Sequence, residues 1–275
     1  MANHLLLLGC RMVLLGVLAY LPVSAHAKCS RIIQVPISPI GQSVIVSGDK
    51  VSGVYPDLLR AAESPSTCVF EFSVAPRARL EAMYKDGTLD LLIPATKSPR
   101  RDEMGLFVPM IQSRATVISV AAHHPPIQSL KDLLDRRTLR VAVVRGFDFG
   151  AAYQDLVKAL TAQGRLSEYA DIVSVGRMMD EGLIDATVMP PSIFIGATRD
   201  DPRTANVDKK LRFEPVKELE WGYSGIYISK TALSKADQLA LRKFLEQIAK
   251  SSAVWKAFQK YYPPDALEGS MKPLK

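Results

Sequence analysis

Apolar and polar residues follow two alternating patterns along the chain. Short apolar runs rich in β-branched residues predict strands, and segments with apolar residues at every third or fourth position predict helices. The predicted strands are residues 31–35, 69–74, 89–95, 116–122, 138–144, 184–190 and 224–230. The predicted helices are residues 53–63, 78–87, 129–137, 149–162 and 176–182, and a last one capped by Ser234 through a Ser-x-x-Asp box. This alternation predicts an α/β protein with mostly parallel sheets flanked by helices.

The alternation restarts after the break His123-His124-Pro125-Pro126, which favours two α/β lobes. In open parallel sheets the ligand crevice lies beyond the carboxyl ends of the strands, next to helix N-termini. Two segments fit that position, residues 94–101 in the first half and residues 143–150 in the second half.

The N-terminus has the pattern of a secretory signal peptide. Residues 5–21 are almost wholly apolar, and Ala25-His26-Ala27 is a small-residue cleavage site, so we expect cleavage before Lys28 and export to the periplasm. A retained membrane anchor is the alternative. The remaining 248 residues are enough for two modest domains, and no other apolar run approaches the length of a membrane span.

Two cysteines, Cys29 and Cys68, remain after cleavage. An even pair in an exported protein predicts a disulfide. Each cysteine lies just before a predicted strand, so the two sulfurs meet at one edge if those strands are parallel neighbours. Such a bond takes both thiols out of the chemistry.

The stretch ATKSPRRDE, residues 95–103, places two arginines where a helix begins. Ser98 is a suitable N-cap and Pro99 suits the first helical position. The first turn of a helix favours acidic residues, so Arg100 and Arg101 require a negative charge nearby.

Composition and motifs exclude several classes of function. The net charge is +7, or +6 without residues 1–27, which in an exported protein suggests small anions or the cell surface rather than nucleic acid. His123 and His124 are adjacent in a Pro-rich break, a poor arrangement for one metal ion. Neither G-x-S-x-G, a phosphate loop nor G-x-G-x-x-G opening a helix is present. We therefore expect binding rather than catalysis, with no cofactor and no metal.

Four segments, in order, resemble the periplasmic solute-binding proteins of the polar amino acid type. They are GVYPDLL at residues 53–59, LEAMYKDGTLDLLIPATKSPRRDEMGLFVPMI at residues 80–111, SLKDLLDRRTLRVAVVRGFDFG at residues 129–150 and EGLIDATVM at residues 181–189. The resemblance implies a two-lobe periplasmic-binding-protein-like fold with a two-stranded hinge and a ligand in the cleft. It places lobe 1 at residues 28–120 and 224–275, and lobe 2 at residues 121–223, with hinge crossings near 119–123 and 222–226.

The resemblance also implies the ligand contacts. The carboxylate-binding arginine of that family falls on Arg101 and its hydroxyl on Thr96, so the ligand would supply the missing negative charge. Arg100 is then a surface residue. Arg79 could reach the same cleft, or pair with Glu81 or Asp102 on the surface. The candidate ligand-binding residues are Arg101, Thr96, Ala95, Arg79, Asp148, Gly146 and Tyr55.

The chain departs from the family pattern in lobe 2. The acid that usually binds an α-amino group aligns with Pro190, and Asp148 stands where a small hydroxyl residue is common. Asp148 could bind an ammonium group or act as a helix N-cap. No stacking aromatic is evident among residues 37–42.

Three functions follow from this reading. The first is a monomeric periplasmic receptor that captures a small anionic or zwitterionic metabolite for an ABC-type importer. The second is an enzyme on the same scaffold, similar to cyclohexadienyl dehydratases, with Asp148 or Glu103 as the acid. The third is an accessory protein that binds a periplasmic partner.

Overall fold

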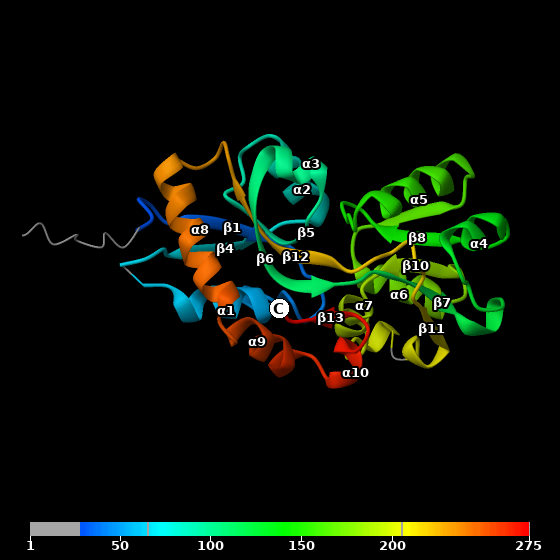
Figure 1. Ribbon diagram of the computed structural model, residues 1–275. Coiled ribbons are helices and arrows are strands. Elements are labelled where there is room, and N and C mark those ends of the chain that lie inside the picture. Colours follow the sequence, from blue (N-terminus) through cyan, green and yellow to red (C-terminus); the bar gives the residue numbers. More distant parts are fainter. Residues whose placement is uncertain (1–27, 65, 205, 275) are drawn as a thin grey trace, which may run out of the picture.

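The computed structural model describes residues 28–64, 66–204 and 206–274. The predicted signal peptide lies outside these residues. Among the described residues, no helix is long and apolar enough to cross a membrane. Two lobes lie side by side and are joined by extended strands (Figure 1).

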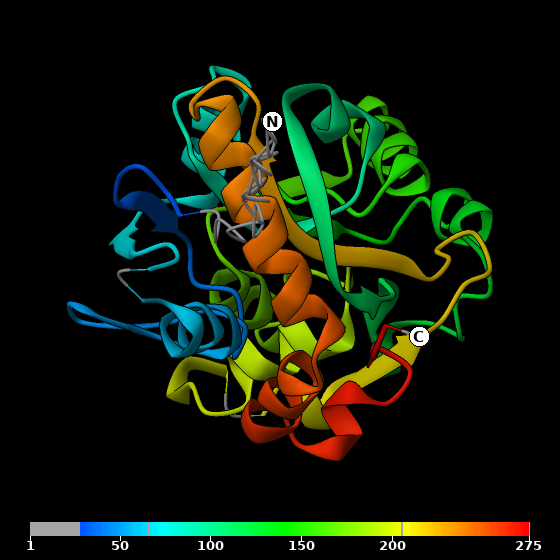
Figure 2. The same ribbon diagram turned by 60° about the vertical axis from the view of Figure 1, so that its left-hand side comes forward.

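Lobe 1 is built around a four-stranded sheet of order β13-β6-β12-β5, with the pair β1-β4 beside β5. Its strands are β1 (Ile33–Ile37), β4 (Phe70–Val74), β5 (Leu91–Thr96), β6 (Gly105–Ser113), β12 (Gly222–Ser229) and β13 (Met271–Lys272), with the hairpin β2 (Ile45–Ser47) and β3 (Lys50–Ser52). Its helices are α1 (Val54–Ala62), α2 (Arg77–Lys85), α3 (Pro99–Met104), α8 (Lys235–Lys250), α9 (Ala253–Tyr261) and α10 (Pro264–Leu267). The long helix α8 crosses the face of this sheet (Figure 2).

Lobe 2 is built around a five-stranded sheet of order β11-β7-β10-β8-β9. Its strands are β7 (Thr116–Val120), β8 (Val141–Val144), β9 (Leu166–Tyr169), β10 (Ala186–Met189) and β11 (Leu211–Glu214). Its helices are α4 (Leu130–Asp135), α5 (Ala151–Ala162), α6 (Ile172–Asp180) and α7 (Pro191–Thr198). Two apolar clusters, one on each face of the sheet, form its core.

Neither large sheet is mostly parallel, because the four-stranded sheet is antiparallel throughout and the five-stranded sheet is mixed. The pairs β1–β4, β8–β9 and β8–β10 are parallel, whereas β12 and β7, the strands next to the crossings, pair antiparallel with all their neighbours. Antiparallel neighbours are expected there, because a strand that returns from the other lobe enters the sheet from the opposite end.

The crossings between lobes differ from their predicted positions. Residues 116–120, assigned from the sequence to lobe 1, form β7 in the sheet of lobe 2. The first crossing is therefore at Arg114 and Ala115, and the second covers residues 215–221, between β11 and β12. The Arg114 guanidinium links the two, because it donates to the carbonyls of Leu219 (2.9 Å) and Val216 (3.1 Å).

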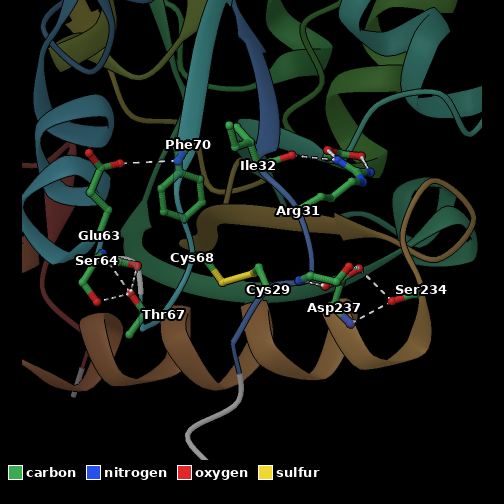
Figure 3. The surroundings of a disulfide bond; sticks show 12 residues. Cys29, Arg31, Ile32, Glu63, Ser64, Thr67, Cys68, Phe70, Ser234 and Asp237 are labelled. Atoms are coloured by element: carbon green, nitrogen blue, oxygen red, sulfur yellow. Dashed lines mark hydrogen bonds and ion pairs between the residues drawn. A yellow bond between two sulfur atoms is a disulfide. The ribbon is translucent and has the colours of Figure 1, made fainter.

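The predicted disulfide is confirmed. Cys29 and Cys68 are bonded, and each precedes one strand of the parallel pair β1–β4 (Figure 3). The residue after Cys29, Ser30, binds Asp237 at the start of α8 through its backbone N–H (2.6 Å) and hydroxyl (2.8 Å). The beginning of the described chain is thus fixed to both β4 and α8.

Helix α7 of lobe 2 also packs on lobe 1. Its Phe194 belongs to a core cluster of lobe 2, whereas Ile195 is buried in the core of lobe 1. At its N-terminus the Ser192 N–H donates to Ser270 Oγ (3.0 Å), and the two hydroxyls are 2.8 Å apart. Ser270 precedes β13, and its carbonyl accepts from the backbone N–H of Arg114 in the first crossing (2.9 Å). The C-terminal segment therefore contacts both lobes and the hinge.

Candidate functional site

A small cavity lies where the two lobes meet. Its volume is about 30 Å³, room for about two water molecules. Both lobes contribute to its lining, which consists of Ile40, Arg77, Pro94, Ala95, Thr96, Arg101, Phe147, Asp148, Phe149, Ile193 and Ser224. A larger groove of about 670 Å³ on lobe 1, at Val108 and Trp255, lacks such a convergence of buried charges.

Arg101 is placed in the cavity by the turn that follows β5. Ser98 is the N-cap of α3 and Pro99 its first residue, as the sequence predicted, although the Ser98 hydroxyl makes no capping hydrogen bond. The Arg101 side chain is only 2% exposed. Its Nη1 donates to the Thr96 carbonyl (2.9 Å), which holds the guanidinium under the end of the strand.

Arg77, rather than Arg79, is the arginine of α2 that reaches the cavity. Arg77 opens the helix after Pro76, is 3% exposed and donates to the Pro94 carbonyl (2.7 Å). Arg79 is exposed, and its side chain makes no ion pair or hydrogen bond within the described ranges. Of the two alternatives for Arg79, the structure shows the exposed one, and Arg77, two residues earlier, lies in the cleft. The sequence pattern does not fix which side chain of the first turn faces inward.

Glu81, one turn after Arg77 on α2, supplies negative charge to both buried arginines. Its Oε1 accepts from Nη2 of Arg77 (2.7 Å) and from Nη2 of Arg101 (2.6 Å). Burial alone would raise the pKa of Glu81, but the two guanidiniums outweigh it and hold that pKa below its ordinary value. The carboxylate is charged at neutral pH.

Asp148 brings the charge of lobe 2 to the same place. It follows β8, its side chain is 2% exposed, and its Oδ2 lies 3.3 Å from Nη2 of Arg100 across the cleft. Burial raises the pKa of Asp148, but Arg101, the Gly150 N–H and Arg100 together lower it by more. The pKa is therefore below its ordinary value, and Asp148 also stays ionised. Oδ1 accepts from the Gly150 N–H (3.0 Å), and Gly150 itself is the N-cap of α5.

Arg100 is not a simple surface residue. Its side chain is 65% exposed, but it pairs with Asp148 and approaches Glu81 Oε2 (3.5 Å). We call Arg77, Glu81, Arg100, Arg101 and Asp148 the cleft charge cluster. The negative charge that Arg100 and Arg101 require is thus present in the protein as Glu81 and Asp148.

The other candidate residues divide into two groups. Ala95 and Thr96, at the end of β5, line the cavity. Tyr55 does not, because it packs edge-on against Phe258 in the core of lobe 1, where burial raises its pKa. Gly146 also lies outside the lining. Its backbone has φ +85°, and a Cβ added to it would lie 3.1 Å from the backbone of Ala78 on α2. Gly146 permits the close approach of the lobes.

Both lobes contribute apolar residues to the lining, and its aromatic residues come from lobe 2. Phe147 and Phe149 pack edge to face with ring centres 5.6 Å apart, and Ile193 of lobe 2 and Ile40 of lobe 1 also line the cavity. Residues 37–42, where the resemblance places a stacking aromatic residue, contain none, and this pair of lobe 2 was not predicted. The described residues hold no group of three or more His, Cys, Asp or Glu suited to a metal ion.

Comparison with solved structures identifies the fold. EhuB in complex with hydroxyectoine superposes with a TM-score of 0.68 at 18% identity, covering 87% of this chain and 92% of that protein. An amino acid ABC transporter substrate-binding protein from Streptococcus pneumoniae, bound to L-arginine, gives 0.66 at 18% identity, covering 83% and 93%. The chain has the fold of the periplasmic solute-binding proteins.

An ancestral amino-acid-binding protein, a precursor of cyclohexadienyl dehydratase, also has this fold, with a TM-score of 0.63 and 17% identity over 84% of this chain and 95% of that protein. No protein-family model matches the chain. No curated protein matches it either. At such identities the similarity concerns the fold alone.

Proposed function

We propose that this protein is a solute-binding receptor that encloses a small anionic or zwitterionic molecule between its two lobes. The observation that carries the proposal is the opposite charge of the two cavity walls. Lobe 1 presents the guanidiniums of Arg77 and Arg101, and lobe 2 presents the carboxylate of Asp148. A molecule fits between such walls when its acidic group faces the two arginines.

The small cavity requires that the lobes separate for ligand entry. Ligand pockets usually measure about 300–1,000 Å³, an order of magnitude more than the space between the lobes. The hinge formed by the crossings at Arg114 and residues 215–221 is the place where such opening would occur. Ligand capture then consists of opening, entry beside Asp148 and closure.

We place the receptor in the periplasm, with an ABC-type importer as its partner. The predicted signal peptide and the disulfide suit an oxidising compartment. The streptococcal protein of the same fold is an amino acid ABC transporter substrate-binding protein.

The proposal is tested by thermal shift of residues 28–275, with the disulfide intact, against amino acids, keto acids, dicarboxylic acids and prephenate. A ligand at 100 times its Kd adds about 2.7 kcal/mol, or roughly 5–10 °C for a chain of this size. The rise in Tm should be lost in Arg101→Lys. Lysine keeps the positive charge but lacks the planar guanidinium that donates to a carboxylate through two N–H groups. If none of these compounds raised the Tm (a flat panel), the receptor proposal would be rejected and a protein partner favoured.

A dehydratase on this scaffold is the second candidate, because the fold is shared with the ancestral precursor of cyclohexadienyl dehydratase. Of the acids nominated for it, Glu103 is exposed on α3 outside the cavity, and the lowered pKa of Asp148 makes it a poor proton donor at neutral pH. We expect no loss of prephenate absorbance on incubation with the protein. A measurable loss would establish the enzyme.

A further inference from the structure

The buried members of the cleft charge cluster cancel one another. Arg77 and Arg101 carry two positive charges, and Glu81 and Asp148 carry two negative charges. Arg100 adds a positive charge that is largely exposed and screened by solvent. Taken over both lobes, the buried charge around the cavity is therefore close to zero, although two guanidiniums are buried there.

Glu81 binds Arg101 in the way that a ligand carboxylate would. Its two oxygens face Nε and Nη2 of Arg101 at 3.4 and 2.6 Å, a side-on arrangement with two N–H donors. The Nη1 groups of both buried arginines are bonded to backbone carbonyls. Among the described residues, the Nε of Arg77 is the guanidinium nitrogen of this buried pair that has no acceptor.

We propose that the Glu81 carboxylate occupies the anion seat of the cleft, which is the position beside Nε and Nη2 of Arg101 where a ligand carboxylate would bind. The cleft therefore admits ligands without net charge, zwitterions included, and rejects simple anions. This inference rests on the proposed function in treating the cleft as the ligand site. An anion would add an uncompensated charge to a buried neutral cluster, which is costly. A zwitterion brings both charges, its ammonium group near Asp148 and an acceptor near the Nε of Arg77.

The test is Glu81→Gln, which keeps the shape of the side chain and removes its charge. The probe is sodium acetate, compared with acetamide plus sodium chloride at equal ionic strength. Glu103→Gln, which removes an exposed charge from α3, is the matched control. We expect a saturable rise in Tm with acetate in Glu81→Gln, with an apparent Kd at least tenfold lower than in the wild type or in Glu103→Gln.

Two results would overturn the inference. One is a wild-type Kd for acetate within threefold of that of Glu81→Gln, and the other is no acetate-specific rise in Glu81→Gln. If Glu81→Gln does not fold without a ligand, the yield of refolding with acetate or with acetamide tests the inference instead. Recovery with acetate and not with acetamide supports the anion seat, and equal or absent recovery rejects it.

The solute panel separates this inference from the proposed function. A flat panel together with an acetate effect in Glu81→Gln would reject the receptor and keep the anion seat. A wild-type protein that binds dicarboxylic acids more tightly than zwitterions would keep the receptor and reject the role of Glu81.

Discussion

Asp148 is the residue through which lobe 2 enters the cleft charge cluster. Its buried carboxylate contacts an arginine of lobe 1 that is mostly solvated, so the pair itself adds little to stability. The same carboxylate is the acid of lobe 2 in the cavity lining. Loss of this carboxylate should therefore change the affinity for a ligand more than it changes the free energy of unfolding.

We expect Asp148→Asn to weaken a zwitterionic ligand at least tenfold while changing the free energy of unfolding by less than about 1 kcal/mol. The amide can still accept from the Gly150 N–H but no longer attracts an ammonium group. Calorimetric titration and urea unfolding measure the two effects. Asp155→Asn, an equal change of charge at an exposed position of α5, should leave affinity unaltered. An unchanged affinity in Asp148→Asn would remove Asp148 from the site.

Glu81 makes stability depend on acid pH. Its pKa is lowered by folding, so the folded state binds fewer protons than the unfolded state, and the resulting stabilisation is present above about pH 4 and is lost as the pH falls toward the lowered pKa. Urea unfolding at several pH values below 5 should show a smaller loss of stability in Glu81→Gln than in the wild type. Glu103→Gln should follow the wild type. Parallel curves for all three proteins would contradict this assignment.

The disulfide acts at the scale of the elements, because it joins the beginnings of β1 and β4. It closes a loop of 39 residues, which in the chain-entropy model contributes roughly 3–4 kcal/mol. Replacing Cys29 and Cys68 together by serine should lower the free energy of unfolding by about that amount. Reduction of the wild type with dithiothreitol should have the same effect, and no further effect on the double variant. Equal stability with and without the bond would show that packing alone holds β1 and β4.

Most elements were predictable because their apolar patterns are local. Each predicted strand overlaps an observed one, and Ser234 and Ser129 both cap helices through their hydroxyls. The strand β6 was missed as a strand, since Pro109 lies within it and proline is rare inside sheets. Which sheet a strand joins is decided by distant partners, so the place of β7 in lobe 2 could not be read from its own residues.

The candidate site was predictable only in part, for a related reason. Arg101, Thr96, Ala95 and Asp148 follow strand ends, where the fold gathers its ligand groups. Arg77 and Glu81 lie on a helix, and their spacing of four residues would have indicated an ion pair. The meeting of Arg77 and Arg101 on one Glu81 oxygen depends on how α2 packs beside α3, which the sequence pattern does not specify.

At the scale of the whole molecule, the lobes are joined by more than two crossing strands. Helix α7 contributes to both cores, and Ser270 binds both α7 and the first crossing. Gln42 of lobe 1 also donates to the Gly196 carbonyl of α7 (3.1 Å). These contacts join α7 and the first crossing to lobe 1, so opening of the cleft has to shift or break them.

Removing residues 270–275 should therefore make opening easier. The truncated protein loses β13 and the Ser270 hydroxyl, and we expect a larger radius of gyration in small-angle scattering without ligand. Ser270→Ala, which keeps the strand but not its hydroxyl, should give an intermediate effect. Scattering curves that coincide for all three proteins would show that the C-terminal segment does not restrain the lobes.

The path of the chain through the two sheets has a consequence for folding order. The five-stranded sheet is complete once Glu214 is available, whereas the four-stranded sheet needs strands from Leu91 to Lys272. Lobe 2 is therefore an uninterrupted insertion that can reach its native pairing while lobe 1 still lacks β12 and β13. Because distant pairings form slowly, refolding should show a fast phase in lobe 2 and a slower phase that ends with docking of the last residues.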